Sequence, residues 1–171
     1  HNQVQYELDN AYFSIGARDG VISLKRSLLG DPTDTYRLTV YAVDGGSPVL
    51  RSRPNDVEIF VMRNRYSPEI EGEPYSKALL QSVAPGSDVV TISAIDRDER
   101  EPFNRLQYEI IGEDAAGAYF RIDATNGRIT VSNNLETDAS REYQIRVRVS
   151  DGGTPPRTDT TLVTVPVNRN L

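Results

Sequence analysis

The chain contains the pattern Asp-Gly-Gly-x-Pro twice. It reads DGGSP at Asp44–Pro48 and DGGTP at Asp151–Pro155, so the two copies lie 107 residues apart. Each copy follows a stretch in which apolar and polar residues alternate, at 36–42 and at 143–149. Alternation with a period of two is typical of a half-buried β-strand. A match of this length indicates one structural module that is used twice.

Upstream of these strands the spacing between matching residues changes. Asn2–Tyr6 matches Asn104–Tyr108 at a spacing of 102 residues. The second copy is preceded by residues 66–103, for which the first copy has no counterpart. We therefore expect a partial first domain over residues 1–64, which lacks its first two strands, and a complete second domain over residues 65–171.

Strand patterns account for most of the second domain. The dipeptide Asn126-Gly127, a strong tight-turn signal, separates the strand-like stretches 119–122 and 128–131. Such turn signals recur about every 8–12 residues, which is typical of a β-sandwich of about seven strands. The expected fold class is therefore all-β, with two sandwiches in tandem and the first one incomplete.

The missing strands have a consequence for the first domain. A sandwich without two of its strands exposes part of its core and an unpaired sheet edge. The side chains expected on this uncovered face are Val4, Tyr6, Leu38 and Val40. Two explanations stay open: the chain is truncated, or another polypeptide supplies the missing N-terminal strands in trans.

Composition narrows the possible functions. Hydrophobic residues make up 37% of the chain and the formal net charge is −6. An acidic surface disfavours nucleic acid as a partner, and it either attracts cations or is simply a solvated surface. No run of about 18 apolar residues exists, so we expect no direct membrane insertion by this part of the protein.

Catalysis is not expected. The only histidine is His1 and there is no cysteine, so a nucleophile with a neighbouring base has no obvious candidate. The paired acids Asp96 and Asp98 lie in a loop, where they fit cation binding as well as they fit acid–base chemistry. We expect a binding protein rather than an enzyme.

Several motifs of the second domain resemble those of cadherin repeats and occur in the order found in that family. They are Asp96-Arg97-Asp98, Asn104 to Tyr108, Phe120-Arg121-Ile122, Leu135-Glu136-Thr137-Asp138, and Tyr143 to Pro155. The resemblance covers essentially the whole chain. It implies Greek-key β-sandwiches in the ectodomain of a single-pass protein, on the extracellular side of the cell membrane.

The resemblance also implies a metal. Cadherins bind Ca²⁺ where two repeats meet, and Ca²⁺ takes six to eight oxygen ligands from carboxylates, carbonyls and amides. Carried over to this sequence, the family's ligands for one such ion are Asn64, Asp96, Asp98 and Asp151. Two other interpretations stay open: the Asp96–Asp98 loop is ordinary solvated surface, and Asp151 shapes only its own turn.

The linker between the domains departs from the family pattern. Met62, Arg65 and Tyr66 stand where the family has acidic or amide ligands, and Arg169 is aligned with Arg65 in the second linker. An arginine puts a permanent cation where an anionic ligand belongs. We therefore expect at most one weak Ca²⁺ site at the first joint. Alternatively, Arg65 and Arg169 pair with the leftover acids.

The resemblance implies cell–cell adhesion, with these repeats forming an internal joint of reduced calcium binding. The expected partners are other cadherin ectodomains, bound homophilically or heterophilically. An alternative is a receptor or ligand-binding module, and a further one is a purely structural spacer of a large cell-surface protein. An exposed apolar patch would favour the binding module over the spacer.

Overall fold

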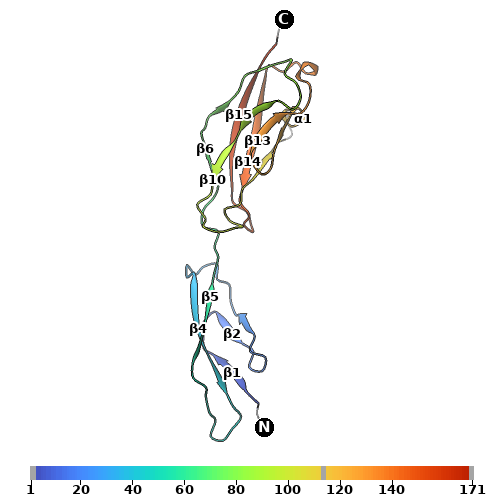
Figure 1. The fold of residues 1–171 in the computed structure, drawn as a ribbon. Coiled ribbons are helices and arrows are strands. Elements are labelled where there is room, and N and C mark those ends of the chain that lie inside the picture. Colours follow the sequence, from blue (N-terminus) through green and yellow to red (C-terminus); the bar gives the residue numbers. More distant parts are fainter. Residues whose placement is uncertain (1–2, 113–114, 170–171) are drawn as a thin grey trace. The chain divides into compact units, whose positions relative to one another are not determined.

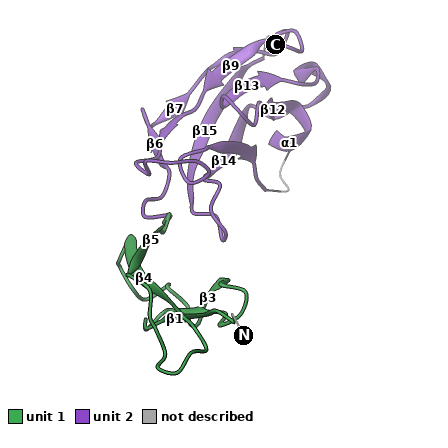
Figure 2. Ribbon diagram, turned by 60° about the horizontal axis from the view of Figure 1, so that its bottom comes forward, with its two compact units in different colours: residues 1–63 green, residues 64–171 purple. Residues whose placement is uncertain are grey.

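The computed structural model describes residues 3–112 and 115–169, and nearly all of its regular structure is β-strand. The chain divides into two compact units, His1–Arg63 and Asn64–Leu171 (Figure 2). This division falls one residue earlier than the sequence prediction had placed it. Among the described residues, no helix is long and apolar enough to cross a membrane.

Unit 1 has two small antiparallel sheets in its described residues. One has the strand order β1-β4-β5, and in the other β2 pairs with β3. In β4, Tyr36 and Leu38 are buried while Arg37 and Thr39 are exposed, because successive side chains of a strand point to opposite faces. The strands are β1 Gln5–Leu8, β2 Phe13–Ile15, β3 Ile22–Leu24, β4 Thr35–Val43 and β5 Asn55–Phe60 (Figure 1).

Unit 2 is a β-sandwich. Its largest sheet has the order β11-β14-β15-β7, with β8 also paired to β15, and smaller sheets are formed by β12-β13-β9 and by β10-β6. The elements of its first half are β6 Glu69–Glu71, β7 Tyr75–Ser76, β8 Leu79–Leu80, β9 Asp88–Thr91, β10 Ser93–Ile95 and β11 Gln107–Ile110. Those of its second half are α1 Ala116–Tyr119, β12 Phe120–Ile122, β13 Arg128–Val131, the short 3₁₀ helix η1 Leu135–Thr137, β14 Glu142–Ser150 and β15 Thr158–Asn168.

The core of unit 2 lies on the inner face of β14 and β15. Every second residue of β14 is fully or almost fully buried, from Tyr143 to Val149, and these residues pack against buried valines of β15. Tyr143 lies opposite Val165 across the two strands. In unit 1 the counterpart Tyr36 lies opposite Ile59. The two units therefore share one strand register as well as one sequence pattern.

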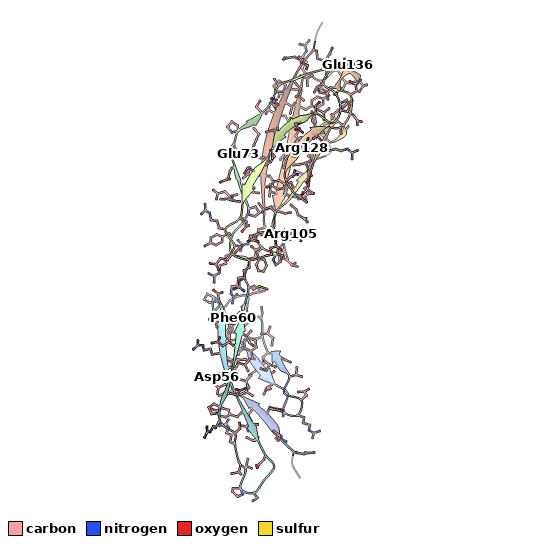
Figure 3. All side chains as sticks on the ribbon, viewed as in Figure 1. Asp56, Phe60, Glu73, Arg105, Arg128 and Glu136 are labelled. Carbon is pink, nitrogen blue, oxygen red and sulfur yellow. The ribbon has the colours of Figure 1, made fainter. Side chains whose placement is uncertain are left out.

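The predicted Asn-Gly hairpin is present between β12 and β13. Gly127 has φ of +71°, which favours glycine. A Cβ at this position would lie 2.4 Å from the carbonyl oxygen of Ile92, whose own N–H donates to the Gly127 carbonyl at 2.9 Å. Beside the turn, Arg128, which is labelled in Figure 3, forms an ion pair with Asp88 across β13 and β9. The glycine thus permits close contact between the hairpin and the strand next to it.

The described residues of unit 1 include no strands like those that cover the equivalent edges of unit 2. In unit 2, β9 pairs with β13, while β7 and β8 pair in parallel with β15. The described residues of unit 1 provide no such partner for β3 or β5. Tyr6 is consequently 36% exposed where its counterpart Tyr108 is 8% exposed, and Leu24 is 54% exposed where Val131 is 1% exposed.

The expectations for individual residues of this face had different outcomes. Val4 and Tyr6 are exposed, as expected. Val40 is half-buried. The expectation for Leu38 was wrong, because it clusters with Phe13 and Tyr36 and is almost fully buried within unit 1 itself. A small core therefore forms without the missing strands.

Candidate metal site at the start of unit 2

Three segments of unit 2 supply the predicted ligands. Asn64 belongs to the first residues of the unit. Asp96 and Asp98 follow the last residue of β10, and Asp151 follows the last residue of β14. Asp98 is only 7% exposed and Asp151 only 4% exposed. Buried carboxylates need compensating partners, so their contacts decide what this cluster can do.

Asp151 is surrounded by hydrogen-bond donors. Its Oδ1 accepts from the backbone N–H groups of Gly153 and Arg157, both at 2.9 Å, and these bonds shape the Asp-Gly-Gly turn. Its Oδ2 accepts from Asn64 Nδ2 at 2.7 Å. Asp151 therefore both shapes its turn and holds one of the other predicted ligands.

Asp98 binds the chain that enters unit 2. Its carboxylate accepts from the backbone N–H of Arg65 at 3.0 Å and from that of Tyr66 at 3.1 Å. Asp96 in turn accepts from the Asp98 N–H at 2.8 Å through its Oδ1. Arg65 and Tyr66 thus contribute backbone donors here, a role that the sequence interpretation of their side chains did not include.

Two oxygens of this cluster are buried without a hydrogen-bond partner among the described residues. They are Oδ1 of Asn64 and Oδ2 of Asp96. A buried acceptor with no donor is unfavourable by about 1–3 kcal/mol. Neutral amide oxygens and anionic carboxylate oxygens are both ligands that a hard cation takes.

The pKa of Asp96 reflects its burial and the acids around it. Burial raises the pKa of Asp96, and the negative charges of Asp98 and Asp151 raise it further. The backbone N–H of Asp98 acts in the opposite direction. The three carboxylates are therefore close enough to repel one another, and a bound cation would relieve that repulsion.

Hydrogen bonds join Asn64 to Asp151 and Asp98 to Asp96. The charges of Asp98 and Asp151 both act on Asp96, so the four predicted ligands belong to one cluster. The cluster is not a preformed metal cage. Within the described part of the chain, no three Asp, Glu, His or Cys side chains have an arrangement that could hold a metal ion.

In unit 2 the two glycines of the Asp-Gly-Gly motif lie too close to neighbouring atoms for a side chain to fit. A Cβ on Gly152 would lie 2.4 Å from the Pro102 carbonyl oxygen, and a Cβ on Gly153 would lie 2.1 Å from Asn64 Nδ2. In unit 1, a Cβ on Gly45 would have its nearest neighbour at 3.8 Å and one on Gly46 at 3.1 Å. The second copy of the motif therefore packs closely against Pro102 and the proposed ligand Asn64, and the first copy has no such close neighbour.

The structure corrects the alignment of Arg169. Its guanidinium donates to the carbonyl oxygens of Leu135 and Ser140, whereas the guanidinium of Arg63 donates to the carbonyl oxygens of Leu28 and Thr33. Both pairs of acceptors are 107 residues apart, so Arg169 is the counterpart of Arg63 and not of Arg65. Sequence reasoning missed this role of the two arginines.

Asp138 also has a partner within unit 2. It accepts a hydrogen bond of 2.6 Å from the Tyr143 hydroxyl, which is the main cause of its lowered pKa. Its counterpart Asp31 accepts from the Thr33 N–H at 2.9 Å. Hydrogen bonds from Thr33 and then from Tyr12 lower the pKa of Asp31. Both carboxylates therefore already have hydrogen-bond donors inside their own units.

A two-unit β-protein with an acidic cluster at the start of its complete sandwich fits the cadherin class. The family model described as "Cadherin domain" matches residues 76–168, just over half of the chain. The chain therefore belongs to the cadherin family.

Curated relatives show the same family over most of the chain. It is 32% identical over 168 residues to Protocadherin Fat 4 of Mus musculus, a match that covers 96% of this chain and 3% of the relative. It is 34% identical over 159 residues to mouse Cadherin EGF LAG seven-pass G-type receptor 2, with 91% of this chain and 5% of the relative covered. The chain thus spans only a small part of the relatives it matches.

Solved structures agree on the fold. Mouse clustered PcdhgC3 EC1-3 matches with a TM-score of 0.60 at 23% identity, over 96% of this chain and 55% of that one. Mouse Cadherin-23 EC22-24 matches with a TM-score of 0.59 at 21% identity, over 97% of this chain and 54% of that one.

Proposed function

We propose that this chain is part of the ectodomain of a large cell-surface cadherin and acts in cell–cell adhesion, with other cadherin ectodomains as homophilic or heterophilic partners. Relatives named as protocadherins and as a seven-pass receptor support a protein at the cell surface. The proposed role is binding, not catalysis. On this proposal the two repeats form an internal joint of a single-pass membrane protein.

The second part of the proposal is one weak Ca²⁺ site formed by Asn64, Asp96, Asp98 and Asp151. The observation that supports it best is the pair of buried oxygens without partners, Asn64 Oδ1 and Asp96 Oδ2. Three carboxylates within electrostatic range supply the charge that a divalent cation needs. Calcium would then tie the first residues of unit 2 to the ends of β10 and β14.

Affinity at this site should be low. The carboxylates of Asp98 and Asp151 already accept hydrogen bonds from backbone and amide donors, so an ion has to compete with these donors. We therefore expect a dissociation constant on the order of 10⁻⁴–10⁻³ M. Arg65 and Tyr66 at family ligand positions are the reason for proposing no further ions here.

Calorimetric titration of the whole chain with calcium tests this site. We expect one weak binding event that disappears in Asp96→Asn, because that change removes a charge from an oxygen with no internal donor. Asp44→Asn is the matched control: Asp44 accepts from Gly46 and Leu50 as Asp151 does from Gly153 and Arg157. Tight binding of several ions, or binding that Asp96→Asn leaves unchanged, would contradict the proposal.

A second candidate function is that unit 1 binds two further strands, supplied either by an upstream segment of the same protein or by another polypeptide. The specific observation is the exposure of Tyr6 and Leu24, whose counterparts in unit 2 are buried under that unit's own strands. An apolar face beside unpaired strand edges is suited to strand addition.

Grafting unit 2's own covering segment onto unit 1 tests strand acceptance. Residues 66–103 would be duplicated directly before Asn2, the position that the repeat spacing assigns to them. We expect slower proteolysis of unit 1 in the grafted chain, and no gain from the same residues in scrambled order. Equal resistance of the native and grafted chains would show that unit 1 needs no such segment.

A further inference from the structure

Arg63 and Arg169 occupy the same place in the two units, just beyond the last strand of each. In unit 1 the N–H of Val61 donates to the carbonyl of Asp34, and in unit 2 the N–H of Val167 donates to the carbonyl of Arg141. These equivalent bonds fix the end of the last strand, and the arginine follows two residues later. Its side chain then reaches back to the loop that precedes β4 or β14.

In unit 1 the guanidinium of Arg63 contacts three oxygens. It donates to the carbonyl of Leu28 at 3.1 Å, to the carbonyl of Thr33 at 2.8 Å and to Asp34 Oδ1 at 3.1 Å. The side chain is only 18% exposed, whereas its partner Asp34 is half exposed. Arg63 is therefore mostly buried, and it joins the C-terminal end of unit 1 to residues 29 to 35 positions earlier.

In unit 2 the guanidinium of Arg169 makes the same kind of contact with carbonyls alone. Nη1 donates to the carbonyl of Leu135 at 3.0 Å, and Nε and Nη2 both donate to that of Ser140, at 2.8 and 2.5 Å. Leu135 is fully buried in the core. Two carbonyl oxygens that face one side chain form a binding position suited to a cation.

We infer that Arg63 and Arg169 are built-in cations that hold the C-terminal end of each unit closed without a metal ion. The guanidinium is always charged and presents its N–H groups in a fixed planar fork, so one side chain satisfies both carbonyls at once. A lysine carries the same charge but lacks this fork. The shape of the arginine is therefore as important as its charge.

The acids in these loops agree with a metal-free end. Asp138 is bound by Tyr143 and Asp31 by Thr33, so both carboxylates already have donors within their own units. In unit 2 the contacts of Arg169 are also separate from the proposed calcium site. Arg169 lies near the start of β14, while Asp151 follows its end. The proposed role of Arg169 can therefore be wrong while the proposed calcium site is right, and the reverse.

Variants of Arg169 in the whole chain, with all divalent ions chelated, test the inference. We expect both Arg169→Gln and Arg169→Lys to lower the melting midpoint of unit 2 by about 8 °C. Hydrogen exchange at the Asp138 and Ser140 amides, which donate within the loop, should become about tenfold faster. The same changes should appear in millimolar calcium.

The matched control is Arg148→Gln. Arg148 pairs with Glu109 at 2.7 Å and both side chains are about half exposed, so its midpoint should move by less than about 2 °C. Wild-type behaviour of Arg169→Gln, complete rescue by lysine, or a loss seen only in calcium would each overturn the inference. If Arg169→Gln does not fold, Arg63→Gln gives the same test at the Asp31 and Thr33 amides, where unchanged exchange overturns it.

Discussion

Replacing Gly153 with alanine should damage unit 2 much more than the same change at Gly46 damages unit 1. A Cβ at either position would lie 3.1 Å from the preceding Asp Oδ1 and 3.1 Å from a proline carbonyl, so these contacts are common to both. Only Gly153 has Asn64 Nδ2 at 2.1 Å from the added atom. The comparison therefore isolates the effect of Asn64.

The magnitude follows from the bond that must break. Asn64 is a short side chain, and moving it away from the new methyl group removes its 2.7 Å hydrogen bond to Asp151. Hydrogen bonds to charged groups contribute about 1.5–3 kcal/mol. We expect Gly153→Ala to lower the free energy of unfolding of unit 2 by about that much more than Gly46→Ala lowers that of unit 1.

Urea denaturation of the whole chain, followed by probes in each unit, measures both losses. Calcium titration of the same variants provides a second readout, because displaced Asn64 can no longer supply its Oδ1. Gly153→Ala should therefore bind calcium more weakly, while Gly46→Ala should bind as the wild type does. Equal losses of stability in the two units, together with unchanged calcium affinity, would refute the argument.

Two further predictions concern pH. Burial raises the pKa of Asp96, so its ionised form destabilises unit 2 as the pH rises above about 4. With divalent ions chelated, Asp96→Asn should raise the melting midpoint at pH 7 and have no effect below about pH 4. A gain that does not depend on pH would contradict this. The Tyr143 hydroxyl is the main cause of the lowered pKa of Asp138, whose stabilising effect is lost as the pH falls through its folded pKa. Tyr143→Phe should raise that pKa in NMR titration and start acid unfolding at a higher pH, and an unchanged titration would show that Ser140 suffices.

The alternating strands and the Asn126-Gly127 hairpin were predictable because burial and turn geometry restrict which residue types occur at each position. The role of Arg169 was not predictable in the same way. The chain has one residue fewer between Arg157 and Val163 than between Leu50 and Val57. This deletion changes the repeat spacing from 107 to 106 just before the linker, and residue identities alone did not reveal it.

The candidate site was only partly predictable. The family pattern named Asn64, Asp96, Asp98 and Asp151, and in the structure two hydrogen bonds and the charges around Asp96 connect them. The donors on Asp98 are backbone N–H groups of Arg65 and Tyr66, which every residue type except proline provides. No pattern of side chains identifies such a contact, because it depends on the path of the chain.

The parallel pairing of β7 and β8 with β15 affects the order in which a growing chain can fold. Tyr75 pairs with Val163, 88 residues later, and Leu79 pairs with Val167. During synthesis, β7 and β8 must therefore wait unpaired until almost the whole unit has left the ribosome, and exposed strand edges are prone to wrong association. In a tandem array of such units, a neighbour that presents similar edges at the same moment is the nearest wrong partner.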